Sequence, residues 1–109
     1  MLDILSVAQK EIIIIDNYAG KELLDILKEF NVNIKIYSAN MNEILIKKYQ
    51  KQYNNVELIS NDKFHDRFII IDKNIIYHCG SSFKDLGKKC FSINRIESNE
   101  LLNDVLKNI

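Results

Sequence analysis

The chain has 109 residues, 15 basic and 15 acidic side chains, and two cysteines. This length predicts one domain covering residues 1–109, and the zero net charge argues against strong global attraction to nucleic acid or anionic lipid. No apolar run is long enough to span a membrane, and two cysteines are too few for a disulfide scaffold. The first residues lack the basic region and cleavage site of a secretory signal, so we expect a cytoplasmic protein.

The first half of the chain alternates helix-like and strand-like segments. Apolar residues recur at helical spacing in three segments, and β-branched residues gather in three others. We expect helices over 2–8, 23–30 and 41–53, and strands over 11–16, 33–37 and 56–59. The continuous run Ile12–Ile15 is typical of a strand that is buried on both faces of a sheet covered by helices.

The second half of the chain begins with a predicted β-hairpin. We expect strands over 67–72 and 75–79, a two-residue turn at 73–74, a short helical turn at 83–86, a last strand at 90–93 and a closing helix after Ser98. Ser98 is a suitable N-cap for that helix. The order of the elements predicts an α/β fold, a layered mixed β-sheet flanked by helices.

The residues with recognisable chemistry surround this hairpin. His65 and Arg67 are two residues apart, so the period of a strand places both side chains on one face. Gly80, Ser81 and Ser82 end the returning strand and come back to the neighbourhood of His65. One imidazole, one guanidinium and two hydroxyls therefore converge at one end of the sheet, where they form a cradle for a tetrahedral oxyanion.

Other polar residues near this hairpin admit two interpretations each. Asp16 either lines the site or ends the first strand, and Arg67 either contacts phosphate or pairs at the strand end with Asp66 or Asp16. His78 is either a satisfied core residue or a support for the site. Lys84 and Lys88 belong to a locally basic segment that either contacts phosphates or forms an ordinary solvated surface. Asp72, at the hairpin turn, is more simply explained as a cap of the turn than as a reacting group.

The two histidines and two cysteines do not form a metal-binding pattern. His65, His78, Cys79 and Cys90 lack the closely spaced ligand pairs of zinc modules. We therefore expect no metal ion and no other cofactor, and we interpret both cysteines as buried thiols.

The hairpin carries a motif that resembles a known superfamily. Residues 65–72 read His-x-Arg-x4-Asp, followed by Gly80-Ser81, which resembles the His-x-Lys-x4-Asp and Gly-Ser signature of the phospholipase D superfamily. The stretch 65–91 and the N-terminal strand that leads into residues 16–18 are similar to a bacterial, phage-associated branch of the superfamily. In that branch such a domain often follows a regulatory domain of the ORF6N type. The resemblance implies a phospholipase D-like half-domain, either on its own or following a DNA-binding regulatory domain in a longer chain.

The resemblance also implies a mechanism. Members of the superfamily cleave or transfer phosphodiesters without a metal ion: one histidine attacks phosphorus, and the histidine of a second motif copy protonates the leaving oxygen. Because this chain carries one copy, the resemblance implies a homodimer. The candidate residues are His65, Arg67 and Asp72 for catalysis, Ser81, Ser82, Lys84 and Lys88 for binding substrate phosphates, and Asp16 and His78 for support.

Three positions depart from the superfamily pattern. Arg67 replaces the usual lysine, Phe83 replaces a common asparagine, and His78 stands where some nucleases have a carboxylate that orients the catalytic histidine. Two functions therefore compete: a metal-independent phosphodiesterase acting on nucleic acid, and a catalytically inactive dimerisation or phosphate-binding module of a DNA-binding regulator. A third hypothesis, an assembly module of a defence or toxin system, has no sequence feature that tests it.

Overall fold

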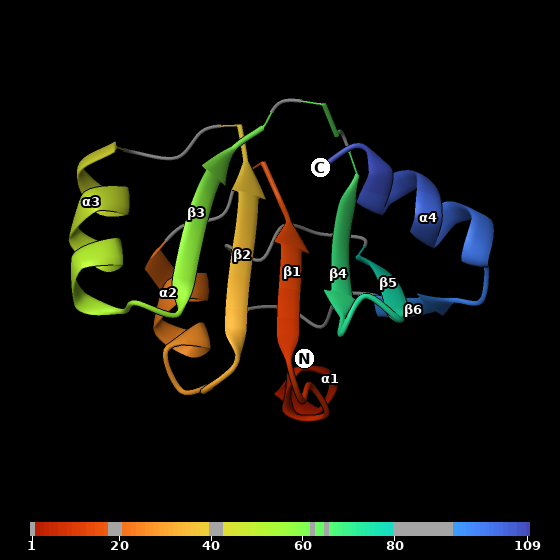
Figure 1. Cartoon of the computed structure of the whole chain (residues 1–109), viewed down its shortest axis with the longest axis horizontal. Helices are drawn as coiled ribbons and strands as arrows, with labels where there is room; N and C mark the ends of the chain where they lie inside the picture. The colour runs from red at the N-terminus through yellow and green to blue at the C-terminus, as the bar shows by residue number, and fades with distance from the viewer. Residues whose placement is uncertain (1, 18–20, 40–42, 62, 65, 80–92) are drawn as a thin grey trace.

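The structure, a computed structural model, describes residues 2–17, 21–39, 43–61, 63–64, 66–79 and 93–109 (Figure 1). In chain order the elements are α1 (Leu2–Ser6), β1 (Glu11–Ile15), α2 (Lys21–Leu27), β2 (Asn33–Ser38), α3 (Glu43–Gln52), β3 (Val56–Ser60), β4 (Arg67–Ile71), β5 (Ile75–Cys79), β6 (Ile93–Ile96) and α4 (Asn99–Lys107). The six described strands form one sheet in the order β3-β2-β1-β4-β5-β6. The predicted α/β fold with a mixed sheet is confirmed.

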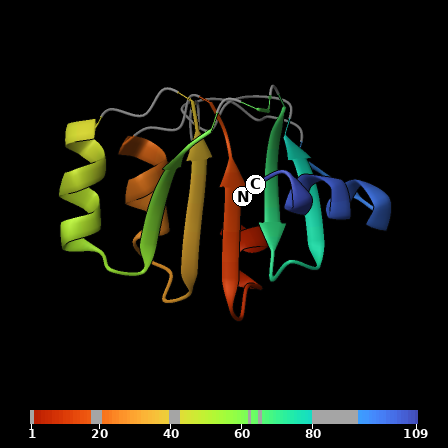
Figure 2. The same cartoon turned by 45° about the horizontal axis from the view of Figure 1, so that its top comes forward.

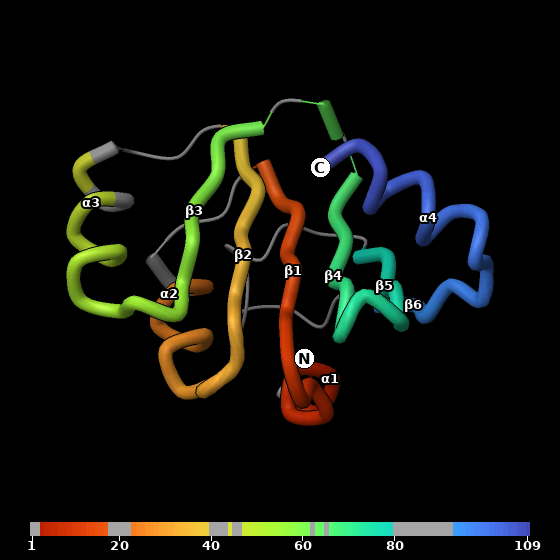
Figure 3. The backbone as a smooth tube through the Cα atoms, viewed as in Figure 1, coloured from red at the N-terminus to blue at the C-terminus, as the bar shows by residue number. Residues whose placement is uncertain are grey.

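The sheet has a parallel half and an antiparallel half. β1 pairs with β2 and β2 with β3 in parallel, and the chain between them passes through α2 and α3 (Figure 3). Parallel neighbours require such crossovers, whereas antiparallel neighbours can be joined by short turns. β4, β5 and β6 follow as antiparallel neighbours, and β1 joins the two halves by pairing antiparallel with β4.

Two apolar cores lie on opposite faces of the sheet. One contains Ile14 and Ile69 and packs against α1, α2 and α3. The other contains Ile15 and packs against α4 through Leu102. Figures 1 and 2 show α4 in front of β4 and β5, with α1 and α2 behind the sheet. Alternate residues of β1 therefore serve different cores, which explains why its apolar run is continuous.

The hairpin turn is one residue longer than predicted. Ile71 pairs with Ile75, so Asp72, Lys73 and Asn74 form the turn. Asp72 and Lys73 have φ values of 53° and 55°, in the left-handed region that glycine and asparagine adopt most readily. The Asn74 N–H closes the turn by donating to the Ile71 carbonyl oxygen at 2.9 Å. Because neither residue with positive φ is a glycine, the sequence carried no clear signal for this geometry.

The C-terminal part agrees with the prediction in its helix and differs in its strand. The last strand is β6, which begins at Ile93, where the strand predicted over 90–93 ends. The predicted helical turn at 83–86 lies outside the described residues. Ser98 is the N-cap of α4, since its hydroxyl oxygen accepts a hydrogen bond from the Leu101 N–H at 3.2 Å.

The stability of the fold should depend on the centre of the sheet. Ile14, at 0% exposure, and Ile44, at 78%, allow the same substitution at a buried and an exposed site. We expect Ile14→Val to lower the free energy of unfolding by about 0.5–1.5 kcal/mol, because a buried methyl group is lost. Ile44→Val should change it by less than about 0.5 kcal/mol. Urea denaturation measures both; equal losses would show that β1 is not the centre of the core.

Candidate functional site

Several strands carry polar residues where they end or begin, along one side of the sheet. We call this side the motif edge and define it by Asp16, Ser38 and Arg67. The carboxyl ends of β1, β2 and β3 reach this edge, together with the start of β4 and the end of β5 (Figure 2). Among the described residues, Asp16 and Ser38 are the buried polar ones, both at 0% exposure. Burial of polar groups away from the surface is unusual and directs attention to this edge.

An ion pair between Asp16 and Arg67 connects β1 to β4 at the motif edge. The Arg67 Nε lies 3.7 Å from the Asp16 Oδ1, with the arginine side chain 27% exposed. The Asp16 N–H donates to the Tyr37 carbonyl oxygen at 3.0 Å, which continues the β1–β2 pairing. The sequence left open whether Arg67 pairs with Asp16 or with Asp66, and the structure shows the first. The guanidinium is thus held beside the carboxylate, while the arginine side chain as a whole stays partly exposed.

Cys79 lies beside this ion pair, because β5 places it opposite Arg67. Burial, the largest cause, and the Asp16 carboxylate together raise the pKa of the Cys79 thiol to about 12, against the opposing effect of the Arg67 guanidinium. A thiol with this pKa stays protonated at neutral pH, so Cys79 is not a thiolate nucleophile there. The predicted buried thiol is confirmed for Cys79, and Cys90 lies outside the described residues.

The other central candidates of the motif lie outside the described residues: His65, Ser81, Ser82, Lys84 and Lys88. Their roles stay predictions. The chain on both sides of His65 is described, however. Before it, the Asn17 Nδ2 donates to the Phe64 carbonyl oxygen at 2.7 Å, and the Asn61 Oδ1 accepts from the Lys63 N–H at 2.8 Å.

These two asparagines hold the segment that leads into the motif. No role was predicted for either of them from the sequence. The available signal was position: Asn17 directly follows the last buried residue at the end of β1, and Asn61 directly follows β3. Asparagine side chains commonly hydrogen-bond to nearby backbone in such connections. Asn17 therefore joins the end of β1 to the residue before His65.

His78 lies on the face of the sheet opposite Arg67 and Cys79. It pairs with Phe68 across the strands, and the two rings meet edge-on with centroids 5.6 Å apart. Its Nε2 is 3.6 Å from the Asp66 Oδ1, an ion pair when the imidazole is protonated. With its side chain 38% exposed, His78 is not a core histidine, so that interpretation is wrong. Its role in supporting His65 stays a prediction.

Asp72 lies at the opposite end of β4 from Arg67. Its carboxylate accepts hydrogen bonds from the backbone N–H groups of Gln9, Lys10 and Glu11, the shortest at 2.8 Å. These bonds, led by the one from Glu11, hold the pKa of Asp72 below its ordinary value of 3.8. The carboxylate thus ties the hairpin turn to the junction of α1 and β1, which favours the structural interpretation of this motif residue over the reacting one.

Among the described residues, no group of three His, Cys, Asp or Glu side chains is arranged to hold a metal ion. None of the helices described is long and apolar enough to cross a membrane.

The fold of this chain is similar to that of known proteins. No protein-family model and no curated protein matches the chain. NucT from Helicobacter pylori is similar with a TM-score of 0.63 at 13% identity, over 94% of this chain and 78% of that one. TrmBL2, an archaeal chromatin protein with a novel mode of DNA binding, is similar with a TM-score of 0.60 at 19% identity, over 96% of this chain. The chain spans 43% of the TrmBL2 chain. At these identities the comparisons show a shared fold.

Asp72 makes a prediction about acid stability. Because its pKa is lower in the folded protein than the ordinary 3.8, its carboxylate stabilises the fold above that pH and loses this effect as the pH falls through the folded-state pKa. We expect Asp72→Asn to unfold at lower urea concentration than wild type at pH 7, with the difference shrinking below pH 4.

The matched control is Asp104→Asn, which changes an exposed carboxylate on α4. It should leave the urea midpoint nearly unchanged at both pH values. If the difference in urea midpoint between Asp72→Asn and wild type stays constant from pH 7 to pH 3, the hydrogen bonds assigned to the Asp72 carboxylate are contradicted.

Proposed function

We propose that this chain is a metal-independent phosphodiesterase of the phospholipase D superfamily, nuclease-like and active as a homodimer in the cytoplasm. The observation that carries the proposal is the ion pair between Asp16 and Arg67 at the motif edge. Arg67 lies two residues after His65 in the sequence. This pair supports the proposal because it fixes Arg67, the basic residue of the proposed motif, while the arginine side chain stays partly exposed. The fold shared with NucT, a nuclease of that superfamily, supports it independently.

The proposed reaction follows from the superfamily resemblance. An imidazole nitrogen of one His65 attacks phosphorus, a P–N bond forms, and the P–O bond to the leaving group breaks. The His65 of the second subunit gives its proton to the leaving oxygen. Water then cleaves the P–N bond and regenerates the imidazole. Arg67 of each subunit stabilises the negative charge that develops on the phosphoryl oxygens, and Ser81, Ser82, Lys84 and Lys88 bind phosphates of the substrate.

Nucleic acid is the proposed substrate. TrmBL2 is described as a DNA-binding protein and NucT as a nuclease. The fold of this chain is similar to both. The net charge of zero means that any attraction must come from local groups at the motif edge. Binding should therefore weaken with salt less steeply than for a protein with a broad basic surface.

A second candidate function is a catalytically inactive module that binds nucleic acid or phosphate and dimerises, as part of a phage-type regulatory protein with an N-terminal DNA-binding domain. One observation favours it. His78, at the position where some nucleases have a carboxylate, instead makes its own pair with Asp66. The similarity to TrmBL2, a chromatin protein, agrees with such a role.

Cleavage in the presence of a chelator separates the two functions. We expect the purified protein to cleave single-stranded DNA, double-stranded DNA or RNA in excess EDTA, and His65→Ala to lose at least a thousandfold of that rate, because the nucleophile is removed. Gel electrophoresis of end-labelled substrates measures the rate. The matched control is His78→Ala, which removes the other histidine of the chain and should retain measurable cleavage.

Circular dichroism and light scattering must show that each variant is folded and has the same mass as wild type. Salt-sensitive binding without cleavage, from a folded dimer, would contradict the enzyme and support the inactive module. Cleavage that EDTA abolishes would contradict the metal-independent mechanism.

Mixed dimers test whether two subunits share one site. When equal amounts of wild type and His65→Ala are unfolded together and refolded, about a quarter of the dimers contain two intact histidines if subunits mix at random. Because the proposed reaction needs both, the rate should fall to about a quarter of that of the same total amount of wild type. A rate near one half would mean that each subunit acts alone.

A further inference from the structure

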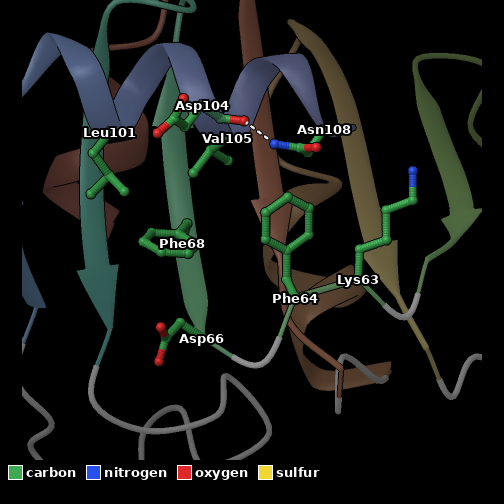
Figure 4. Close-up of a pocket in the computed structure, with 8 residues that line it drawn as sticks. All are labelled: Lys63, Phe64, Asp66, Phe68, Leu101, Asp104, Val105 and Asn108. Atoms are coloured by element: carbon green, nitrogen blue, oxygen red, sulfur yellow. Dashed lines mark hydrogen bonds between the residues drawn. The ribbon is translucent and has the colours of Figure 1, made fainter.

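A cavity of about 310 Å³ lies on the α4 face of the sheet, between α4, β4 and the connection from β3 to β4. We call it the α4 pocket. Figure 4 shows the rings of Phe64 and Phe68 beneath α4, with Val105 above them. The carboxylate-bearing residues Asp66 and Asp104 also line it. Its size is at the lower end of the range for small-molecule sites.

The lining of the α4 pocket suits a flat, largely apolar group that carries hydrogen-bond donors. The half-buried Phe64 ring provides a surface on which an aromatic ring can stack, and the buried Phe68 ring lines the pocket with it. The carboxylates of Asp66 and Asp104 are acceptors only, and they outnumber Lys63, the one cation of the lining. Carboxylates read cytosine in DNA by accepting from its exocyclic amino group. An amino-bearing nucleobase therefore complements this pocket in aromatic character and in hydrogen bonding.

The α4 pocket is directly beside the motif in the chain. Phe64 and Asp66 are the two residues bonded to His65. Strand alternation directs Phe68 to the α4 face and Arg67 to the opposite face. A nucleotide at the motif edge can therefore place its phosphate on the side of Arg67 and its base on the side of α4, where two carboxylates and one lysine make the lining less favourable for a phosphate.

We infer that the α4 pocket is a nucleobase subsite, which holds a base with an exocyclic amino group next to the phosphodiester that is cleaved. This inference rests on the proposed function, because nucleic acid is the ligand in both. It adds a preference that the motif does not supply: single-stranded substrates rich in cytosine should bind more tightly than those rich in thymine, a base of similar size that lacks the amino group.

Binding to the His65→Ala protein tests this subsite without cleavage of the probe. Fluorescence anisotropy would measure the Kd for fluorescent single-stranded oligo-dC and oligo-dT of equal length. We expect oligo-dC to bind about fivefold more tightly, the lower end of the discrimination given by one good base contact. Phe64→Leu in the same background should weaken binding of both oligonucleotides, by up to about tenfold, because a stacking surface is lost.

The Asp104→Ala substitution separates the loss of a hydrogen-bond acceptor from the loss of a negative charge. Removing a carboxylate reduces repulsion of DNA, so affinity for oligo-dT should rise or stay the same. The ratio of the two Kd values should nevertheless fall toward one, since an acceptor for the amino group is lost. The matched control Glu97→Ala removes an exposed carboxylate that does not line the pocket, and it should leave the ratio at its original value.

The outcomes separate this inference from the proposed function. Equal binding of both oligonucleotides, or a ratio that Asp104→Ala leaves unchanged, overturns the subsite, while His65-dependent cleavage of both would still support the nuclease. Displacement of the probe by choline but not by cytidine also overturns it, since the pocket would then bind an organic cation. Absence of both binding and cleavage, from a folded protein, overturns the subsite and the nuclease together.

Discussion

The antiparallel pairing of β1 with β4 joins the two halves of the sheet, and the position of the motif depends on its register. Ile15 lies opposite Phe68, so the next residues outward are Asp16 and Arg67, whose side chains meet at 3.7 Å. A slip of one residue would turn the side chains of β4 to the other face. It would exchange the side chains that β4 contributes to the two cores and separate the ion pair. The packing of Ile14 and Ile69 on one side and of Phe68 and Ile70 on the other excludes that slip.

The same register divides the motif edge between two faces with different chemistry. On the side of α1, α2 and α3, a buried carboxylate holds a guanidinium and the nearby thiol stays protonated. On the side of α4, aromatic rings and carboxylates form a pocket. Phe64 packs on the α4 face and Arg67 lies on the opposite face, and the hydrogen bond from Asn17 holds the Phe64 backbone. The cation and the aromatic pocket thus lie on different faces of the sheet, and both include residues within two positions of His65 in the sequence.

The sequence predicted the features that depend on long apolar runs. The isoleucines of β1 and β4 identify central strands because few other arrangements bury so many β-branched residues in succession. Ser98 was recognisable as a cap because its side chain acts on the N–H three residues later. The partner of Arg67 was narrowed to two aspartates, and the fold was needed to choose between them.

Features that depend on tertiary contacts were harder to predict. The turn at Asp72 and Lys73 adopts positive φ without a glycine, and the carboxylate of Asp72 finds its partners more than sixty residues away. His78 was expected either in the core or as a support for the site, and the pairing of β5 with β4 directs it away from the core and toward Asp66. The α4 pocket combines residues near 64–68 with residues near 101–108, a proximity that no local pattern encodes.

The proposal requires a covalent bond between His65 and the substrate, and trapping this intermediate tests it most directly. The protein would be mixed with labelled single-stranded DNA in excess EDTA, denatured in alkali because a P–N bond is labile in acid, digested and analysed by mass spectrometry. The account predicts a nucleotide adduct on the peptide that contains His65, absent in His65→Ala. DNA cleavage with an adduct on another residue, or with no adduct at any time during the reaction, would contradict it.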